Sequence, residues 1–145
     1  MVEHHVKLEQ FMTYLQHLNR YLRTSAFDKA ENPVTRVQWL LMRQLQRKGE
    51  QTIGQLALKL DVRASTMSQM LDRLEKSNFV LREPDPLDAR VKLIRLTDDG
   101  VRLMEQIDKA WLESMAEPFD HLRDEEKQQL LDLMEKFNAH LPRRG

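Results

Sequence analysis

Residues 52–80 constrain the fold most, because they carry two short helical patterns with almost no chain between them. This stretch reads TIGQLALKLDVRASTMSQMLDRLEKSNFV. Apolar residues recur at three- and four-residue steps in both halves, as they do on the inner face of a helix. These inner-face residues are Leu56, Ala57 and Leu60, then Met67, Met70, Leu71 and Leu74. Asp61 suits the turn between the two halves, so the stretch predicts a helix-turn-helix.

The outer face of the second helix is polar, and its side chains can hydrogen-bond to a base edge or a phosphate. With the arginine just before the helix, these candidate binding residues are Arg63, Ser65, Thr66, Ser68, Gln69 and Arg73. Serine and threonine near a helix start also cap backbone amides, so we expect one of them to cap this helix. Asn78 stands where the helix should stop, because asparagine tolerates the left-handed conformation of a C-terminal cap.

A β-hairpin is predicted next, because the strand-like runs FVLRE and VKLIRLT flank the proline-rich segment PDPLDAR. Period-two alternation places Lys92, Ile94 and Leu96 on one face of the second strand, and we expect Leu81 to pack against them. Thr97 is expected to cap the following helix, whose first turn is acidic, as the helix dipole favours.

Two short helices followed by a hairpin and another helix form the pattern of a winged helix-turn-helix. In that design the second helix enters the major groove of DNA, and the hairpin, or wing, reaches the backbone or the minor groove. Arg90 near the wing tip can enter a narrow minor groove while Asp88 holds its guanidinium, and Lys92 follows on the same ribbon. An isolated loop of this composition would be read as a charged surface turn. Its position after a helix-turn-helix favours DNA binding.

The rest of the chain reads as helices. One apolar stripe covers residues 5–24, and a helix capped by Thr35 and Gln38 runs to about Gly49. Pro118 is expected to end the helix that begins after Thr97, and a last helix starts near Asp124. The terminal helices carry more apolar residues than so small a central module can cover. This predicts a homodimer formed through these helices.

Charge and composition narrow the classes of function that the protein can have. The 23 basic and 23 acidic residues balance, but residues 103–145 hold ten acidic against six basic residues, so a nucleic-acid face is expected in the first two thirds. The chain has no cysteine, no long apolar run, no secretory signal and no catalytic motif, so we expect a cytoplasmic protein that does not bind membranes and is not an enzyme. The five histidines lack zinc-ligand spacing, so neither a metal nor a cofactor is predicted.

The sequence resembles the MarR family of bacterial transcription regulators over nearly its whole length. The stretch TIGQLALKLDVRASTMSQMLDRLEKSNFVLRE and the wing motif DPLDARVKLIRLTDDG carry the resemblance. The most specific positions are Asp88, Arg90, Leu96, Thr97 and Gly100. The resemblance implies an obligate dimer, a recognition helix over about residues 64–77, a pseudo-palindromic operator, and a small lipophilic or aromatic effector bound between the dimer region and the DNA-binding lobe.

Some positions depart from the family pattern. Gln69 replaces a residue that is often basic, so base preference does not carry over, and Asn78 replaces a common glycine. Peroxide sensing is ruled out because it needs a cysteine, and the histidine cluster of zinc-sensing relatives cannot be located.

The predicted fold is mainly α with a small β-hairpin wing (α+β), in a single MarR-type domain spanning 1–145. Residues 1–32 and 103–145 are expected to form the dimerisation helices, and residues 33–102 the winged helix-turn-helix lobe. The predicted function is a ligand-responsive repressor that binds double-stranded DNA. Two alternatives stay open: a winged-helix protein-interaction module, which the zero net charge favours, and a small-molecule-binding protein or enzyme with incidental helix-turn-helix topology.

Overall fold

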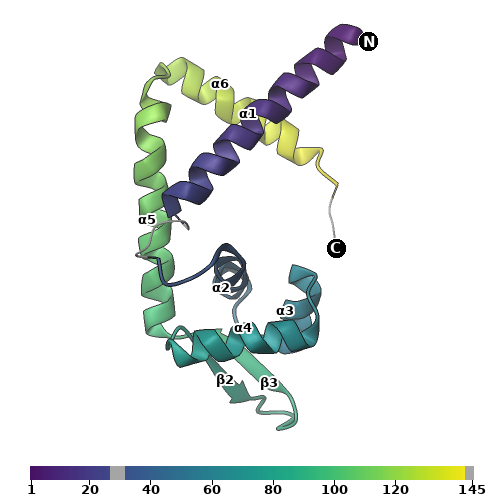
Figure 1. The fold of residues 1–145 in the computed structure, drawn as a ribbon, viewed down its shortest axis with the longest axis vertical. Helices are drawn as coiled ribbons and strands as arrows, with labels where there is room; N and C mark the ends of the chain where they lie inside the picture. Colours follow the sequence, from purple (N-terminus) through teal and green to yellow (C-terminus); the bar gives the residue numbers. More distant parts are fainter. Residues whose placement is uncertain (27–31, 143–145) are drawn as a thin grey trace. The chain divides into compact units, whose positions relative to one another are not determined.

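The computed structural model describes residues 1–26 and 32–142. In chain order the elements are α1 (Val2–Ala26), α2 (Arg36–Lys48), β1 (Gln51–Thr52), α3 (Ile53–Leu60), α4 (Ala64–Lys76), β2 (Val80–Pro84), β3 (Lys92–Leu96), α5 (Asp98–Asp120) and α6 (Asp124–Ala139) (Figure 1). The predicted mainly helical fold with a small β wing is confirmed. No helix in the described part of the chain has the length and apolar character needed to cross a bilayer.

The chain divides into two compact units, residues 1–111 and residues 112–145. The division falls within α5, whose first half packs into the first unit through Leu103, Met104 and Ile107. The other buried apolar residues of this core come from α2, α3, α4, the sheet and the segment before α2. They are Val34, Trp39, Leu41, Met42, Leu45, Leu56, Ala57, Met67, Leu71, Leu74, Val80 and Ile94.

Helix α2 begins and ends where the sequence indicates. Thr35 accepts a hydrogen bond from the Gln38 backbone amide at 3.2 Å and Gln38 returns one to the Thr35 amide at 2.9 Å, which completes the predicted capping box. Arg43 then connects α2 to α5, because its Nη1 donates to both carboxylate oxygens of Asp108 at 3.1 Å. The same guanidinium lies 5.7 Å from the ring centre of Trp39.

The joint between α3 and α4 is a tight reversal built on a left-handed residue. Asp61 has φ 55° and ψ 48°, a conformation that aspartate tolerates better than most residues. The Val62 amide then donates back to the Ala57 carbonyl at 3.0 Å. This confirms the predicted turn.

The prediction that a serine or threonine caps the start of α4 is wrong. The N-cap residue is Arg63, and it makes no side-chain capping hydrogen bond.

The end of α4 is closed by the residue that the sequence indicated. Asn78 has φ 64°, and the amides of Asn78 and Phe79 donate to the carbonyls of Glu75 and Leu74, both at 2.9 Å. This is the bond pattern of a Schellman cap. Because the cap turns the chain sharply, β2 starts directly beneath the end of α4.

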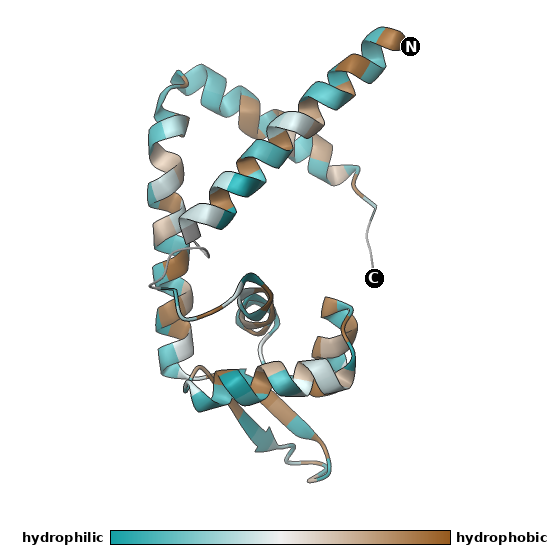
Figure 2. Ribbon diagram, viewed as in Figure 1, coloured by the Kyte–Doolittle hydropathy of each residue, from teal (hydrophilic) through white to brown (hydrophobic). Residues whose placement is uncertain are grey.

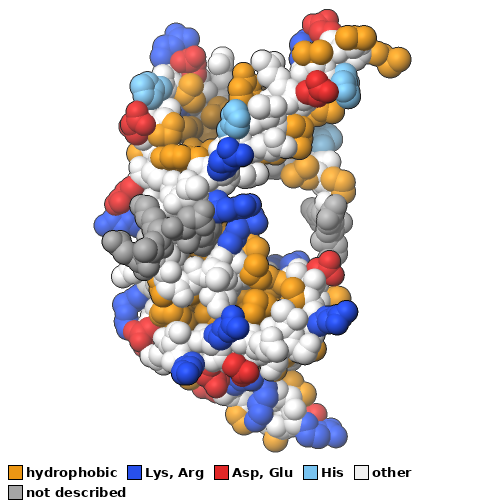
Figure 3. All heavy atoms as spheres, in the orientation of Figure 1, with side chains coloured by type: hydrophobic (Ala, Val, Ile, Leu, Met, Phe, Trp, Pro, Cys, Tyr) orange, Lys and Arg blue, Asp and Glu red, His pale blue; other side chains and the backbone are white. Residues whose placement is uncertain are grey.

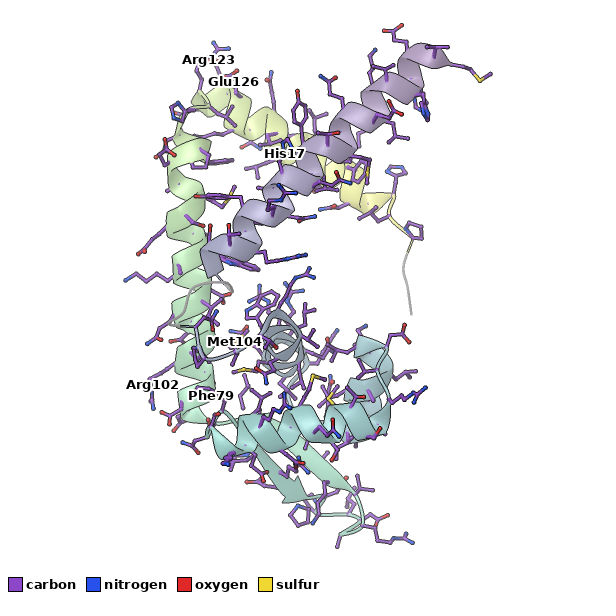
Figure 4. The ribbon with its side chains drawn as sticks, in the orientation of Figure 1. His17, Phe79, Arg102, Met104, Arg123 and Glu126 are labelled. Carbon is purple, nitrogen blue, oxygen red and sulfur yellow. The ribbon has the colours of Figure 1, made fainter. Side chains whose placement is uncertain are left out.

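The start of α5 is hydrogen-bonded to the segment that closes α4, residues 78 and 79. Thr97 accepts a hydrogen bond from the Gly100 amide at 3.0 Å, as the predicted cap requires, and its hydroxyl donates to the Asn78 carbonyl at 2.6 Å. The Thr97 amide also donates to the Phe79 carbonyl at 3.0 Å. Figure 4 shows Phe79 and Arg102 beside the first turns of α5. This junction holds the end of α4 against the start of α5.

The sheet has the strand order β1-β3-β2, with both pairings antiparallel. The register pairs Val80 with Leu96 and Leu81 with Arg95, and directly paired residues share a face. Leu81 therefore lies on the face opposite Ile94, so the expectation that it packs against Ile94 and Leu96 is wrong. The strand β1 was not predicted, because two residues are too short to show any periodicity.

Helix α5 does not end at Pro118, and this prediction is also wrong. The helix continues to Asp120, with the proline inside its last turn. A proline near a helix end removes one backbone hydrogen bond, but its fixed φ suits a helix, so the chain can finish the turn. The amides of His121 and Leu122 then close the helix with bonds to the carbonyls of Pro118 and Phe119 at 3.3 and 3.1 Å.

The terminal helices expose much of their apolar surface. Helix α6 has no buried residue although it runs for 16 residues, and α1 has none in its described residues. Figure 2 shows hydrophobic residues recurring along both helices. The exposed large apolar residues of the two helices are Val2, Val6, Leu8, Met12, Tyr14, Leu18, Tyr21, Leu130, Leu131, Leu133, Met134 and Phe137.

Candidate nucleic-acid interface

The outward face of α4 is polar along its whole length. Met67, Leu71 and Leu74 are buried on the inner face, and the other side of the helix meets solvent. The exposed candidate residues on or just before this helix are Arg63, Ser65, Thr66, Gln69 and Arg73, and Ser68 is half-buried. Short side chains at the first turn leave room for close approach of a partner. The helix therefore presents a row of hydrogen-bonding groups.

The wing is a rigid turn rather than a loose loop. The Asp85 amide donates to the Val91 carbonyl at 2.9 Å, and the Val91 amide donates to the Asp88 carbonyl at 3.0 Å. The side chain of Asp85 accepts from the Leu87 amide at 2.8 Å, which adds a local turn at the tip. Figure 1 shows the hairpin projecting beyond α4, and Figure 3 shows basic and hydrophobic side chains together at its end.

Arg90 and Asp88 form the pair that the sequence predicted. Arg90 Nε and Nη2 donate to the two carboxylate oxygens of Asp88 at 3.1 and 3.2 Å, and the Arg90 amide donates to the same carboxylate at 3.0 Å. These hydrogen bonds hold the guanidinium in one direction, while the Arg90 side chain stays 91% exposed. The side-chain and backbone hydrogen bonds from Arg90 lower the pKa of Asp88.

Arg82 was missed by sequence reasoning, and it connects the wing to α4. Its Nη2 donates to the Ser68 carbonyl at 3.1 Å and pairs with Asp72, and its Nε lies 3.7 Å from Glu75 Oε2. A signal was present in the sequence, because Arg82 lies two residues after the apolar Val80 in a predicted strand and so shares its face. The structure pairs Arg82 with the buried Ile94, which puts it on the inner face of β2. A charge on an inner face needs partners, and here α4 supplies them.

The other basic residues of the hairpin differ in their partners. Lys92 is exposed at the start of β3, opposite Pro84. Arg95 is paired with Glu83, with Nη2 donating to Oε1 at 2.8 Å, and this hydrogen bond lowers the pKa of Glu83. Lys92 is thus the hairpin cation beside Arg90 that remains available to an anionic partner.

We expect the stability of the folded protein to fall as the pH drops below about 4. Glu83, Asp88 and Asp99 all have a lowered pKa in the folded state, and for Asp99 the causes are hydrogen bonds from Arg102 and then Asn78. A lowered folded pKa gives stability that is present above the unfolded pKa and is lost as the pH falls through the folded one. Urea unfolding at pH 7, 5, 4 and 3 measures this, and Asp99→Asn should reduce the loss. A midpoint that stays constant to pH 3 would contradict it.

Within residues 1–26 and 32–142, no group of three or more histidine or acidic side chains is arranged to hold a metal ion. His121, the first residue after α5, lies 3.1 Å from Glu117 in the last turn of that helix, which is an ordinary surface contact.

The capped helix pair, the three-stranded sheet and the projecting hairpin define the class of winged helix-turn-helix proteins. The family model described as "MarR family" matches residues 34–92, from α2 to the start of β3. The HTH-type transcriptional regulator YsmB of Bacillus subtilis is 32% identical over 93 residues, which cover 64% of each chain. An HTH-type transcriptional regulator of Mycobacterium bovis is 31% identical over 76% of this chain and 75% of its own.

The chain belongs to the MarR family. A solved structure of a cysteine-to-serine mutant of MarR from E. coli, complexed with operator DNA, is 25% identical, has a TM-score of 0.63 and is matched over 92% of both chains. The family and these relatives indicate a transcription regulator rather than an enzyme.

Proposed function

We propose that the protein is a homodimeric repressor that binds a pseudo-palindromic operator in double-stranded DNA and is released by a small ligand. One observation carries this proposal: Arg82 fastens the wing to α4, so the polar face of that helix and the Arg90-bearing tip are presented together. A recognition helix and a wing that are held in a fixed position relative to each other can enter neighbouring grooves of one duplex at the same time.

In this proposal α4 enters the major groove. Base edges and phosphates are contacted by its N-cap Arg63, by Ser65, Thr66, Ser68 and Gln69, and by Arg73 in its last turn. The wing lies over the adjacent minor groove, with Arg90 oriented by Asp88 and with Lys92 near the phosphates. Minor-groove insertion suits an arginine that is both exposed and fixed, because the potential there is most negative where the groove is narrow.

We further propose that α1 and the helices after Trp111 join two copies of the chain. A 16-residue helix such as α6 gains little stability alone, and its exposed leucines, methionine and phenylalanine need a second surface. In domain terms, residues 1–32 and 103–145 dimerise and 33–102 form the DNA-binding lobe, with the first turns of α5 also packed in the lobe core. A twofold dimer would place its two α4 helices about 34 Å apart, one turn of DNA.

The proposed effector is a small lipophilic or aromatic compound, in line with the family resemblance. Trp39 and Trp111 are the two tryptophans of the chain, and their ring centres lie 4.8 Å apart at an interplanar angle of 51°. Because they connect α2 to α5, their fluorescence should report a ligand that changes the packing of the lobe against α5. Acting on DNA implies a cytoplasmic location.

A salt titration of duplex binding tests the proposal. Fragments selected from genomic DNA by the purified protein supply the probe, and anisotropy measures the dissociation constant between 50 and 300 mM KCl. With about six phosphate contacts per dimer, the logarithm of the association constant should fall with the logarithm of salt at a slope of about −5.

Sedimentation at the same concentrations should show a dimer. A protein-interaction module would bind no duplex with a steep salt slope, and a protein that stays monomeric while binding DNA would contradict the dimer proposal alone.

A further inference from the structure

Leu87 lies at the tip of the wing with 96% of its surface exposed. Single exposed leucines are common on protein surfaces and need no explanation by themselves. This one differs because the turn that carries it is hydrogen-bonded on both sides. Its own amide donates to the Asp85 carboxylate at 2.8 Å, and the next amide, that of Asp88, donates to the Asp85 carbonyl at 3.3 Å.

Two of the exposed side chains of the tip, those of Leu87 and Arg90, are therefore carried on one hydrogen-bonded turn. Arg90, at 91% side-chain exposure, is the cationic one and Leu87 is the apolar one. The charges from Asp85 to the first residue of β3 balance, since Asp85 and Asp88 oppose Arg90 and Lys92. The segment therefore has no net charge to add to the local contacts of Arg90 and Lys92. Contacts with the base pairs can add to binding beside those two cations.

The floor of the minor groove offers such a contact, and it is not uniform. An A·T pair shows only acceptors there, whereas a G·C pair adds the exocyclic amino group of guanine. An apolar side chain pressed onto that amino group removes it from water and leaves its donor unsatisfied, which is unfavourable. Leucine at this position would tolerate A·T pairs and reject G·C pairs.

We propose that Leu87 contacts the floor of the minor groove beneath the wing and selects A·T base pairs by excluding the guanine amino group. This inference rests on the proposed DNA-binding function. It makes Leu87 a specificity-determining residue, whereas Arg90 supplies charge to the narrow groove.

Inosine separates this contact from other effects, because an I·C pair is a G·C pair without the amino group. Three duplexes are compared that differ only at the base pairs under the wing of the selected operator: A·T, G·C and I·C. The wild-type protein should bind the G·C duplex about tenfold more weakly than the A·T duplex, and the I·C duplex should regain most of that loss.

Leu87→Asn replaces the apolar group with an acceptor that can bond to the guanine amino group, so the ratio of I·C to G·C affinity should fall to about one or below. Leu58→Asn is the matched control, because Leu58 of α3 is 85% exposed and lies outside the wing. The control should keep the wild-type ratio. Arg90 remains in both variants, so any effect of groove width on that arginine is common to them.

The outcomes are distinct. If the wild-type protein binds a duplex but Leu87→Asn keeps the same I·C to G·C ratio, or loses affinity equally on all three duplexes, the inference is overturned and the proposed function stands. If no duplex binds at any salt concentration, the proposed function itself fails. Circular dichroism and sedimentation of both variants exclude misfolding as the cause, since the two leucines are exposed.

Discussion

Replacing Gly100 by alanine should lower the free energy of unfolding by about 3 kcal/mol. A Cβ at this position would lie far inside van der Waals contact with the Phe79 carbonyl oxygen, 3.1 Å from its carbonyl carbon and 3.3 Å from Leu96 Cδ2. The obstacle is mostly backbone, so it cannot rotate away as a flexible side chain would. Moving it would also strain the hydrogen bonds from Thr97 to the carbonyls of Phe79 and Asn78.

Urea unfolding followed by circular dichroism measures this change, at one protein concentration because dimerisation would add to stability. Gly54→Ala is the matched control. Gly54 is exposed in the first turn of α3, and a Cβ there would meet only Thr52 Oγ1 at 3.9 Å. That substitution should stabilise the protein by about 0.5 to 1 kcal/mol, because alanine restricts the unfolded chain. Equal effects of the two substitutions would contradict the close approach at Gly100.

Replacing Arg90 by alanine should weaken operator binding by about 1 to 3 kcal/mol, which is roughly five- to 150-fold in the dissociation constant. The arginine is exposed and held by Asp88 alone, so its removal costs the folded protein little. Its loss would remove the cationic group that the proposal places in the minor groove. Arg90→Lys keeps the charge but loses the bidentate hydrogen-bonding geometry of the guanidinium, so this variant should retain only part of the wild-type affinity.

Arg123→Ala is the control for charge. Arg123 lies outside the lobe, its side chain is 75% exposed, and its Nε contacts Glu126 at 3.1 Å, much as Arg90 contacts Asp88. Both alanine variants change the net charge by the same amount. At matched salt, only the Arg90 variant should lose affinity while both remain folded and dimeric. Unchanged affinity of Arg90→Ala would refute the minor-groove role.

The local features of this protein could be predicted from the sequence. The capping box of α2, the turn at Asp61 and the cap at Asn78 all involve residues within about five positions of each other. Helical periodicity also separated the inner and outer faces of α4. The pairing of Asp88 with Arg90 could be predicted for the same reason, since the two residues occupy one turn of the wing.

Two local features were predicted wrongly or left out: the end of α5 and the cap at the start of α3. Pro118 was expected to stop α5, yet the helix continues to Asp120. The missing bond and the steric conflict of a proline concern the turn before it, and its own φ is helical, so the next two residues can still be helical. The capping box of Thr52 and Gln55 that starts α3 was visible as a threonine followed three residues later by glutamine, but it was overlooked. Neither difference changes the path of the chain at the candidate interface.

By itself the sequence determined the helix pair, the hairpin and the polar face of α4, because each depends on spacing and capping between near neighbours. Only the tertiary structure decided the rest. The short strand β1, the bond from Arg82 to the Ser68 carbonyl of α4 and the need for glycine at position 100 depend on residues 14 to 43 positions apart. Such contacts are set by strand register and by the closest approach of two backbones, which no local pattern records.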